Sequence, residues 1–482
     1  MTWWASFRTP CEESHRSRHS NLPTAPVRAA DLKLSSFPAD DYCDASARVA
    51  ITDPMFSNSG NSTLARPPLV LHLETALIYS GSTVILQRFL ELYDLTRLHH
   101  GVLFRWPGTR ERHLELHGDF RRDGVRFLDE TEGDICGKPY TPGERGVALH
   151  TGPTGAGERI PVLHTLGYFR YIALRLYPRA RRLAAFMKQA GVAHLQLHNG
   201  PAGNIPGIMA ARQTGIGCTG RLQSFLTLNP FERRLASRMD HLLCVSNAIR
   251  EHYLAQGLPP AFVTTVLDGV LEKDMLPPPD TDTLKSEIGI PEDARLVSLV
   301  GKLSWWKGHE TFVDAAAIVC RELNDVFFTI CGGPEENEPD YQKVIEARIA
   351  EHGLQDRVKI MGFRRDARRF TAAASVAVLA SALPEPSGNA ILEALALGRP
   401  AVATNAGGMP DYIEHGVTGQ LVPPQDPPAM ARAILLYLKD SELAARAGAA
   451  AQKRMRESHL VDGSVRRSED IFAEAIARRR HS

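Results

Sequence analysis

Short apolar runs alternate with amphipathic stretches along most of this chain. Runs rich in Val, Ile, Leu and Ala are typical of buried parallel strands; the clearest are residues 69–73, 193–197, 242–245, 296–300 and 376–380. A loop with Gly, Ser or Pro follows each run, and a stretch with helical spacing comes next. This repeated order of strand and helix predicts an α/β fold with parallel, doubly wound sheets.

A proline-rich stretch divides the pattern into two units. The sequence LPPPDTDT, residues 276–283, is typical of a linker and places a domain boundary near residue 278. We expect one Rossmann-like domain over residues 66–275 and a second over residues 284–457. Residues 1–65 carry many Ser, Pro, Arg and Asn with little periodicity, which predicts a disordered or loosely attached extension.

The stretch from residue 376 to 402 reads as a strand, a loop and a helix. An apolar run ends at a loop that contains Pro384, Pro386 and Gly388, and Asn389 is well suited to cap the helix that follows. Strong helix formers continue to residue 397, where a glycine and a proline end the helix. The loop lies at the carboxyl end of its strand, where open α/β sheets bind ligands.

Two carboxylates, Glu385 and Glu393, frame this loop with seven residues between them. The helix start between them offers backbone N–H groups and the positive end of a dipole, which favour an anion. A phosphate on the amides and hydroxyl-rich rings on the carboxylates would suit a nucleotide sugar. The alternative is a pair of exposed glutamates near a helix N-terminus, which helices favour in any case.

Cations and glycines occur at the corresponding loops of other strands. Lys302 and Lys307 flank the loop after the run at 296–300, and lysine is a suitable point charge for phosphate. Gly81 and Gly333 follow strand-like runs, Gly362 ends one, and a glycine lets backbone approach a ligand closely. The alternatives are solvated lysines and an ordinary strand-to-helix turn at Gly81.

The segment EPSGNAILEALALGRPAVAT, residues 385–404, resembles the E-x7-E signature of family 4 retaining glycosyltransferases, also described as glycosyl transferases group 1. The next segment, AGGMPDYIEHGVTGQLVPPQD, resembles the rest of that family's nucleotide-binding half. The resemblance implies a GT-B fold, with two Rossmann-like domains facing a central cleft and the last helix, residues 463–482, packed on the first domain. It also implies transfer of a sugar from a nucleotide diphosphate sugar to a hydroxyl group, with retained α configuration.

The resemblance also implies roles for individual residues. Lys302, which stands where arginine is usual, and Lys307 would grip the diphosphate together with the amides of Asn389, Ala390 and Ile391 after Gly388. Glu385 would hold sugar hydroxyls and Glu393 the ribose. Gly81 and Gly333 would approach the diphosphate, and Gly362 would lie beside the base. His198 would touch the sugar or acceptor from the first domain, or would be a strand-end core histidine.

These roles require neither a metal ion nor another cofactor. The expected partners are a nucleotide sugar donor and a glycan or lipid-linked acceptor in polysaccharide, lipopolysaccharide or other glycoconjugate synthesis. A sugar-nucleotide epimerase or a phosphorylase on the same architecture is an alternative, although a phosphorylase would need a pyridoxal lysine. A catalytically silent sugar-nucleotide-binding protein is another alternative, which the presence of both glutamates and both lysines disfavours.

Two short motifs point elsewhere and are rejected on context. GIGCTG, residues 215–220, matches the dinucleotide fingerprint, but a helix is predicted before it and a strand after it, the reverse of the required order. Asp280-Thr281-Asp282 matches a D-x-D metal motif, but no strand precedes it, and we interpret it as part of the linker.

The composition bears on the class of protein and on its expected location in the cell. The 482 residues carry a net charge of +1, which argues against a dedicated nucleic-acid binder. No run of about 18 apolar residues predicts a membrane span, and no apolar stretch near the N-terminus suggests a signal peptide. Seven scattered cysteines fit reduced thiols. We expect a cytoplasmic protein, with residues 168–189, aromatic and basic, either contacting anionic lipid at the inner face of the membrane or forming solvated surface helices.

Overall fold

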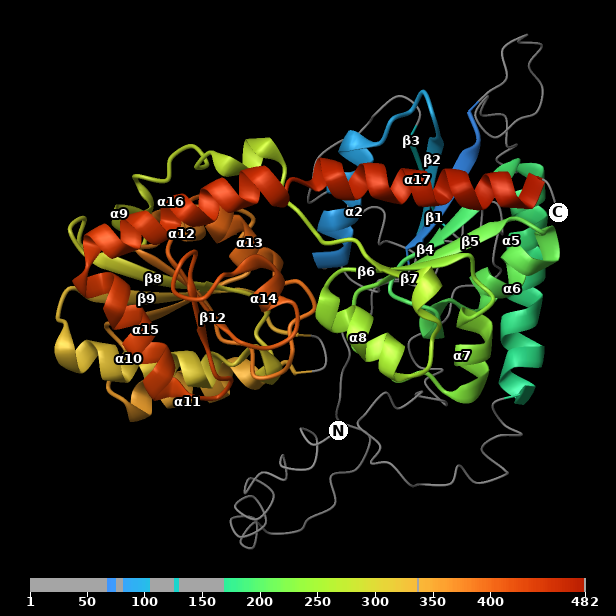
Figure 1. The fold of residues 1–482 in the computed structure, drawn as a ribbon. Helices are drawn as coiled ribbons and strands as arrows, with labels where there is room; N and C mark the ends of the chain where they lie inside the picture. Colours follow the sequence, from blue (N-terminus) through green and yellow to red (C-terminus); the bar gives the residue numbers. More distant parts are fainter. Residues whose placement is uncertain (1–66, 75–80, 105–124, 130–168, 336–337, 481–482) are drawn as a thin grey trace, which may run out of the picture. The chain divides into compact units, whose positions relative to one another are not determined.

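The computed structural model describes residues 67–74, 81–104, 125–129, 169–335 and 338–480. These described residues belong to one compact unit, which contains two parallel sheets with helices packed against them (Figure 1). The predicted extension, residues 1–65, lies outside the described residues. The α/β, doubly wound architecture expected from the alternating pattern is confirmed.

The first sheet has the strand order β3-β2-β1-β4-β5-β6-β7 among the described residues, and all its pairs are parallel. Its strands are β1 (Leu69–Glu74), β2 (His99–Phe104), β3 (Val125–Asp129), β4 (Val192–Leu197), β5 (Gly217–Leu222), β6 (His241–Cys244) and β7 (Val263–Thr265). Its helices are α2 (Gly81–Leu92), α5 (Tyr177–Gln189), α6 (Ile205–Thr214), α7 (Pro230–Ala236) and α8 (Asn247–Ala255).

The second sheet has the order β10-β9-β8-β11-β12-β13 and is also parallel throughout. Its strands are β8 (Arg295–Val300), β9 (Val326–Cys331), β10 (Val358–Gly362), β11 (Val376–Leu379), β12 (Ala401–Thr404) and β13 (Gln420–Val422). Its helices are α9 (Leu284–Glu287), α10 (His309–Glu322), α11 (Tyr341–Glu351), α12 (Ala367–Ala373), α13 (Asn389–Ala396), α14 (Met409–Tyr412), α15 (Pro427–Lys439) and α16 (Ser441–Ser458). The last described helix, α17 (Val461–Arg480), follows α16 in the chain but packs on the first sheet.

The edge strand β3 and its neighbour β2 were not predicted from the sequence. The apolar pattern of β2 is interrupted by two histidines and a glycine, and β3 is a five-residue strand within a polar stretch. The strands nearer the centre of each sheet have longer apolar runs because helices cover both of their faces. Strands β1, β5 and β11, for example, are buried over their whole length.

Pro178 lies within the basic, aromatic stretch of residues 168–189, where a proline in a helix interior would break the helix. Instead, a π-helical segment, Ile172–Leu176, leads directly into α5, and Pro178 lies in the first turn of that helix. A proline is tolerated in a first turn, where its missing N–H is not needed by the helix, and a π turn can absorb its ring. The helical path is therefore continuous.

Two chain segments cross between the sheets and contact each other. The Val270 N–H donates to the His459 carbonyl at 3.1 Å, and the Val461 N–H donates to the Val270 carbonyl at 3.0 Å. A Cβ on Gly269 would lie 2.7 Å from the His459 oxygen, so only glycine fits there. After this crossover, α17 packs along the first sheet beside α2, and Phe472 is buried in that core (Figure 1).

Candidate functional site

The loop after β11 is set by glycines in the left-handed region. Gly388, and not Asn389 as predicted, is the N-cap of α13, with φ at 65°. A Cβ there would approach the Met409 side chain to 2.5 Å, so both backbone angle and packing select glycine. Asn389 and Ala390 open the helix, while the Ile391 N–H donates to the Gly388 carbonyl at 2.9 Å. A phosphate would therefore have to be bound by the start of the turn, before Ile391.

Glu385 and Lys307, assigned to sugar and phosphate respectively, form an ion pair. The Lys307 Nζ donates to the two carboxylate oxygens of Glu385 at 3.0 and 2.8 Å, and the Ser381 hydroxyl donates to one of them at 2.8 Å. Glu385 is only 7% exposed. A lysine ammonium has three N–H donors, so the pair leaves one for another acceptor. The Trp306 ring lies 4.1 Å from the Nζ and contributes a cation–π contact.

Close backbone approach places Lys307 beside Glu385. Lys307 ends a short 3-10 helix, Trp305–Lys307, and Gly308 follows with φ at 71°. A Cβ on Gly308 would lie 1.9 Å from the Ala380 carbonyl oxygen, which immediately follows β11. The loop after β8 is thus pressed against the loop after β11, which brings together two residues 78 positions apart.

The β12–α14 loop holds the backbone of Glu385. The Gly408 N–H donates to the Glu385 carbonyl at 2.8 Å, and a Cβ on Gly407 would lie 2.0 Å from the same oxygen. Asp411, a few residues on, accepts from the Asn247 N–H and side-chain amide at 2.8 and 2.7 Å. The support of Glu385 therefore reaches the first helix turn of α8, on the other sheet.

Lys302, Gly333 and Gly362 come together at the carboxyl ends of β8, β9 and β10. The Gly333 carbonyl accepts from the Leu303 N–H at 2.8 Å, and the Gly332 N–H donates to the Gly362 carbonyl at 2.9 Å. Lys302 pairs with Glu335 at 3.3 Å on a side chain that is 35% exposed. Sequence reasoning missed Glu335, which shares the charge of Lys302.

Glu393 lies in α13 and pairs with a residue that the sequence did not single out. Arg88, in the middle of α2, donates to the Glu393 carboxylate at 2.8 Å. The available signal was an arginine among the apolar residues Ile85, Leu86 and Phe89, because a cation on a buried helix face requires an anionic partner. The Gly81 loop can be described only in part: Gly81 begins α2, and residues 75–80 lie outside the described residues.

His198 lies within the core of the first sheet. It is 3% exposed, and its Nε2 lies 3.2 Å from Nδ1 of His72, whose other nitrogen lies 2.9 Å from His100. Burial lowers the pKa of His198 well below its usual value and that of His72 to about 3, so both rings are neutral near pH 7. This environment favours the core-histidine alternative.

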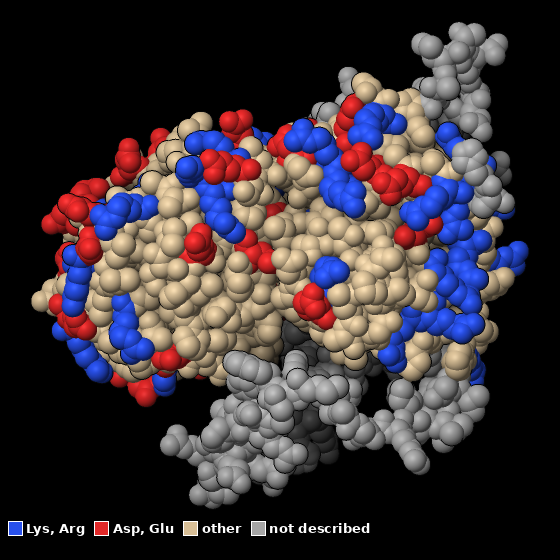
Figure 2. Space-filling model, in the orientation of Figure 1, with Lys and Arg blue, Asp and Glu red and all other residues tan. Residues whose placement is uncertain are grey.

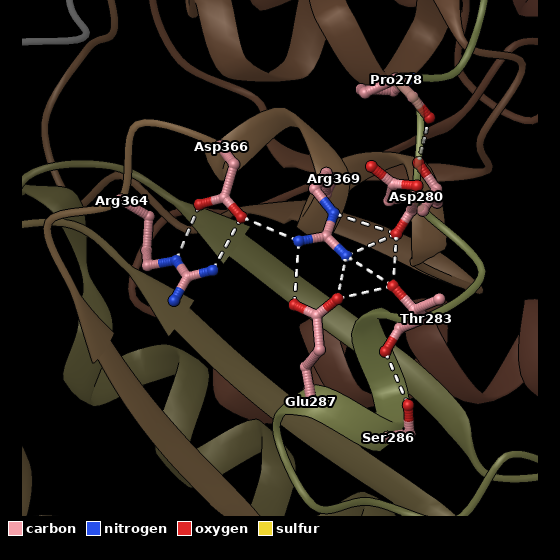
Figure 3. A network of polar contacts seen from close by, with 9 residues as sticks. Pro278, Asp280, Thr283, Ser286, Glu287, Arg364, Asp366 and Arg369 are labelled. Carbon is pink, nitrogen blue, oxygen red and sulfur yellow. Dashed lines mark hydrogen bonds and ion pairs between the residues drawn. The ribbon is translucent and has the colours of Figure 1, made fainter.

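The two rejected motifs have structural roles. Helix α6 ends before Gly215 and β5 begins at Gly217, so GIGCTG joins a helix to a strand. In the D-x-D motif, the Asp280 carbonyl accepts from the Arg369 Nε at 3.1 Å, and Arg369 also binds Glu287 and Asp366 (Figure 3). Arg364 holds the other side of Asp366 at 2.7 and 2.8 Å. The network fastens the linker to α12 and α9.

The second half of the chain is similar to known glycosyltransferases. Residues 280–454 match the family model of glycosyl transferases group 1. An alpha-D-kanosaminyltransferase of Streptomyces kanamyceticus is 37% identical over 183 residues, which cover 36% of this chain and 45% of that protein. A D-inositol 3-phosphate glycosyltransferase of Corynebacterium urealyticum is 33% identical over 166 residues, 34% of this chain and 39% of that protein. The chain thus spans about half the length of these relatives, or less.

The fold is shared over a much longer stretch. The crystal structure of Anabaena Alr3699/HepE in complex with UDP and glucose superposes with a TM-score of 0.67 at 21% identity, over 84% of this chain and 100% of that one. A glycosyltransferase structure from Rickettsia africae gives a TM-score of 0.68 at 17% identity, over 86% and 99%. The two doubly wound sheets therefore have the GT-B arrangement that the sequence predicted.

Proposed function

We propose that this chain is a glycosyltransferase that moves a sugar from a nucleotide diphosphate sugar to a hydroxyl group of a glycan or lipid-linked acceptor, with retention of the α configuration and without a metal. The observation that chiefly supports this proposal is the buried ion pair between Lys307, in the loop after β8, and Glu385, in the loop before α13. The match of residues 280–454 to glycosyl transferases group 1 supports the same reaction, as does the UDP bound in a protein of the same fold.

The chemistry demands stabilisation of a leaving diphosphate and of a positive sugar. The departing oxygens gain negative charge, which the third N–H of Lys307, the charge of Lys302 and the start of α13 would meet. The sugar becomes oxocarbenium-like, and the Glu385 carboxylate beside it would stabilise that charge. Lys307 then has two tasks, since it orients Glu385 and neutralises the diphosphate. We assign no nucleophile, because the resemblance to family 4 retaining glycosyltransferases implies a reaction on one face of the sugar.

Nucleoside diphosphate binding should not depend on a divalent metal. Titration calorimetry with UDP, GDP and ADP is expected to identify one ligand whose Kd is the same in about 5 mM EDTA as in the presence of Mg²⁺. The reason is that lysine charges and helix amides would neutralise the diphosphate in place of a metal ion. Binding that appears only with Mg²⁺ or Mn²⁺ would contradict metal-independent binding of the diphosphate and would indicate a metal-binding role for Asp280 and Asp282.

We also propose that the protein contacts an anionic lipid surface through α5 and the π-helical segment before it. Leu174 and Tyr177 are 60% and 45% exposed, and Arg170, Arg181 and Lys188 are exposed on the same stretch. Figure 2 shows Lys and Arg gathering at the edge of the molecule where Figure 1 places α5 and the end of α17. Apolar side chains beside several cations fit the interface of an anionic membrane. None of the described helices is long and apolar enough to cross a membrane.

Flotation with vesicles tests this contact. The full chain should float with vesicles that contain about 30% phosphatidylglycerol and should be released as salt rises from 0.05 to about 0.5 M. The triple variant R170Q/R181Q/K188Q should lose most of this binding. Its control, K343Q/R446Q/K453Q, removes the same charge from exposed positions on α11 and α16. Equal flotation of the two variants, or binding that salt does not change, would contradict the proposal.

A further inference from the structure

Arg88 joins three parts of the molecule through one guanidinium group. Its Nη2 donates to Glu393 Oε1 at 2.8 Å, its Nη1 donates to the Gly269 carbonyl at 3.2 Å, and its Nε lies 3.4 Å from Asp274 Oδ2. The side chain is only 7% exposed. All three nitrogens of the planar fork are thus engaged, which is an arrangement that lysine could not reproduce.

The anchors of Arg88 belong to the crossover between the sheets. Gly269 and Asp274 lie in the segment that leads from β7 towards β8, and Asp274 lies within a short 3-10 helix, Glu272–Met275. Val270, the residue after Gly269, is hydrogen-bonded to His459 and Val461 of the second crossover segment. Arg88 therefore has two contacts besides Glu393, both on the side where the chain passes between the two sheets.

Glu393 needs such a partner if it is to bind a ribose. Its side chain is 21% exposed, so it is partly accessible, and an unheld glutamate loses rotamer freedom when it binds a ligand. Arg88 engages one carboxylate oxygen, Oε1, and so restrains the direction of the group. A carboxylate has acceptor sites for further donors, and two ribose hydroxyls are donors of the right kind.

We propose that Arg88 is a positioning residue that orients Glu393 for the ribose hydroxyls of the donor and ties that carboxylate to the crossover. The inference rests on the proposed function, because it presupposes a ribonucleotide at Glu393. It deepens that function by assigning a residue of the first sheet's α2 to the recognition of a ligand bound beside the second sheet. Arg88 touches neither substrate nor reacting atoms in this scheme.

The test compares a ribonucleotide with its 2′-deoxy analogue. Wild-type protein should bind the preferred nucleoside diphosphate about 10- to 100-fold more tightly than the 2′-deoxy form, the range for a hydrogen bond to a charged group. R88M, which keeps the length of the side chain but removes its charge and donors, should bind the two forms within about threefold of each other. R88K should recover only part of the discrimination. Calorimetry provides both affinities and needs no turnover.

A second ion pair between α2 and the 3-10 helix Glu272–Met275 supplies the control variant. Lys273, beside Asp274, donates to Glu91 of α2 at 2.6 Å, and its side chain is 66% exposed. K273M should keep the wild-type discrimination. If R88M weakens both nucleotides equally and retains their ratio, Arg88 is only structural and the inference is wrong. A wild-type protein that binds the ribo form tightly without discriminating also overturns it, whereas failure to bind any nucleoside diphosphate overturns the proposed function itself.

Discussion

Replacement of Lys307 with methionine should lower the kcat of sugar transfer by about 10³-fold, the upper range for loss of one preorganised electrostatic group. Methionine roughly keeps the side chain's length and its apolar stem, but it removes the positive charge that faces Glu385, the diphosphate and the Trp306 ring. Two effects of one substitution add here: the leaving group loses a cation, and the carboxylate loses the partner that orients it. Binding of the diphosphate alone should weaken as well, by about 10-fold or more.

The same variant should be less stable. Glu385 is 7% exposed, and removal of its cation leaves a buried carboxylate with no ionic partner, which costs about 3 kcal/mol of unfolding free energy in comparable cases. Chemical denaturation of K307M measures this directly. K302M is the matched control, since Lys302 is 35% exposed and pairs with Glu335 at a longer distance; its stability should change little. Unchanged kcat in K307M, at saturating donor and acceptor, would remove Lys307 from the reaction.

Glu385→Gln should lower kcat by about 10²-fold and change donor KM little. The amide is isosteric, so it can still accept from Ser381, but it carries no negative charge to stabilise an oxocarbenium-like sugar. Steady-state kinetics with saturating acceptor separates the two constants. The variant should also lose stability, because Lys307, 16% exposed, would then lack its anion.

Glu393→Ala provides the contrast. Ribose contacts are the same in the ground state and the transition state, so this variant should chiefly raise donor KM. It also leaves Arg88 without one carboxylate, while Asp274 and the Gly269 carbonyl remain. If Glu385→Gln and Glu393→Ala raise donor KM alike and leave kcat unchanged, the division of roles between the two carboxylates is wrong, even if the protein is a GT-B glycosyltransferase.

Local patterns predicted local structure. The strand, loop and helix between residues 376 and 397 follow from apolar β-formers, prolines and helix formers in sequence, and each signal acts within a few residues. The cap was misassigned to Asn389, because the packing that requires a glycine at position 388 comes from Met409, which lies at the start of α14. No short-range pattern contains that contact.

Side-chain pairing could not be predicted in the same way. Lys307 and Glu385 were each selected from the sequence, but their mutual bond depends on the close approach of two loops at Gly308 and Ala380. Arg88 lies 305 positions from Glu393, and only the fold brings the two together. His198 shows the converse, since a strand-end histidine looks the same in sequence whether it faces a ligand or, as here, a buried histidine cluster.

The most direct test of the proposed transfer is a turnover assay with labelled donors. The full chain would be incubated with a panel of nucleoside diphosphate sugars that carry label in the sugar, together with lipid and oligosaccharide acceptor fractions. Label should move from one donor to an acceptor hydroxyl, in the donor's α configuration, with equal release of nucleoside diphosphate. Label that stays on the nucleotide as an epimerised sugar would contradict a transferase and indicate an epimerase, and tight binding without any turnover would indicate a binding protein.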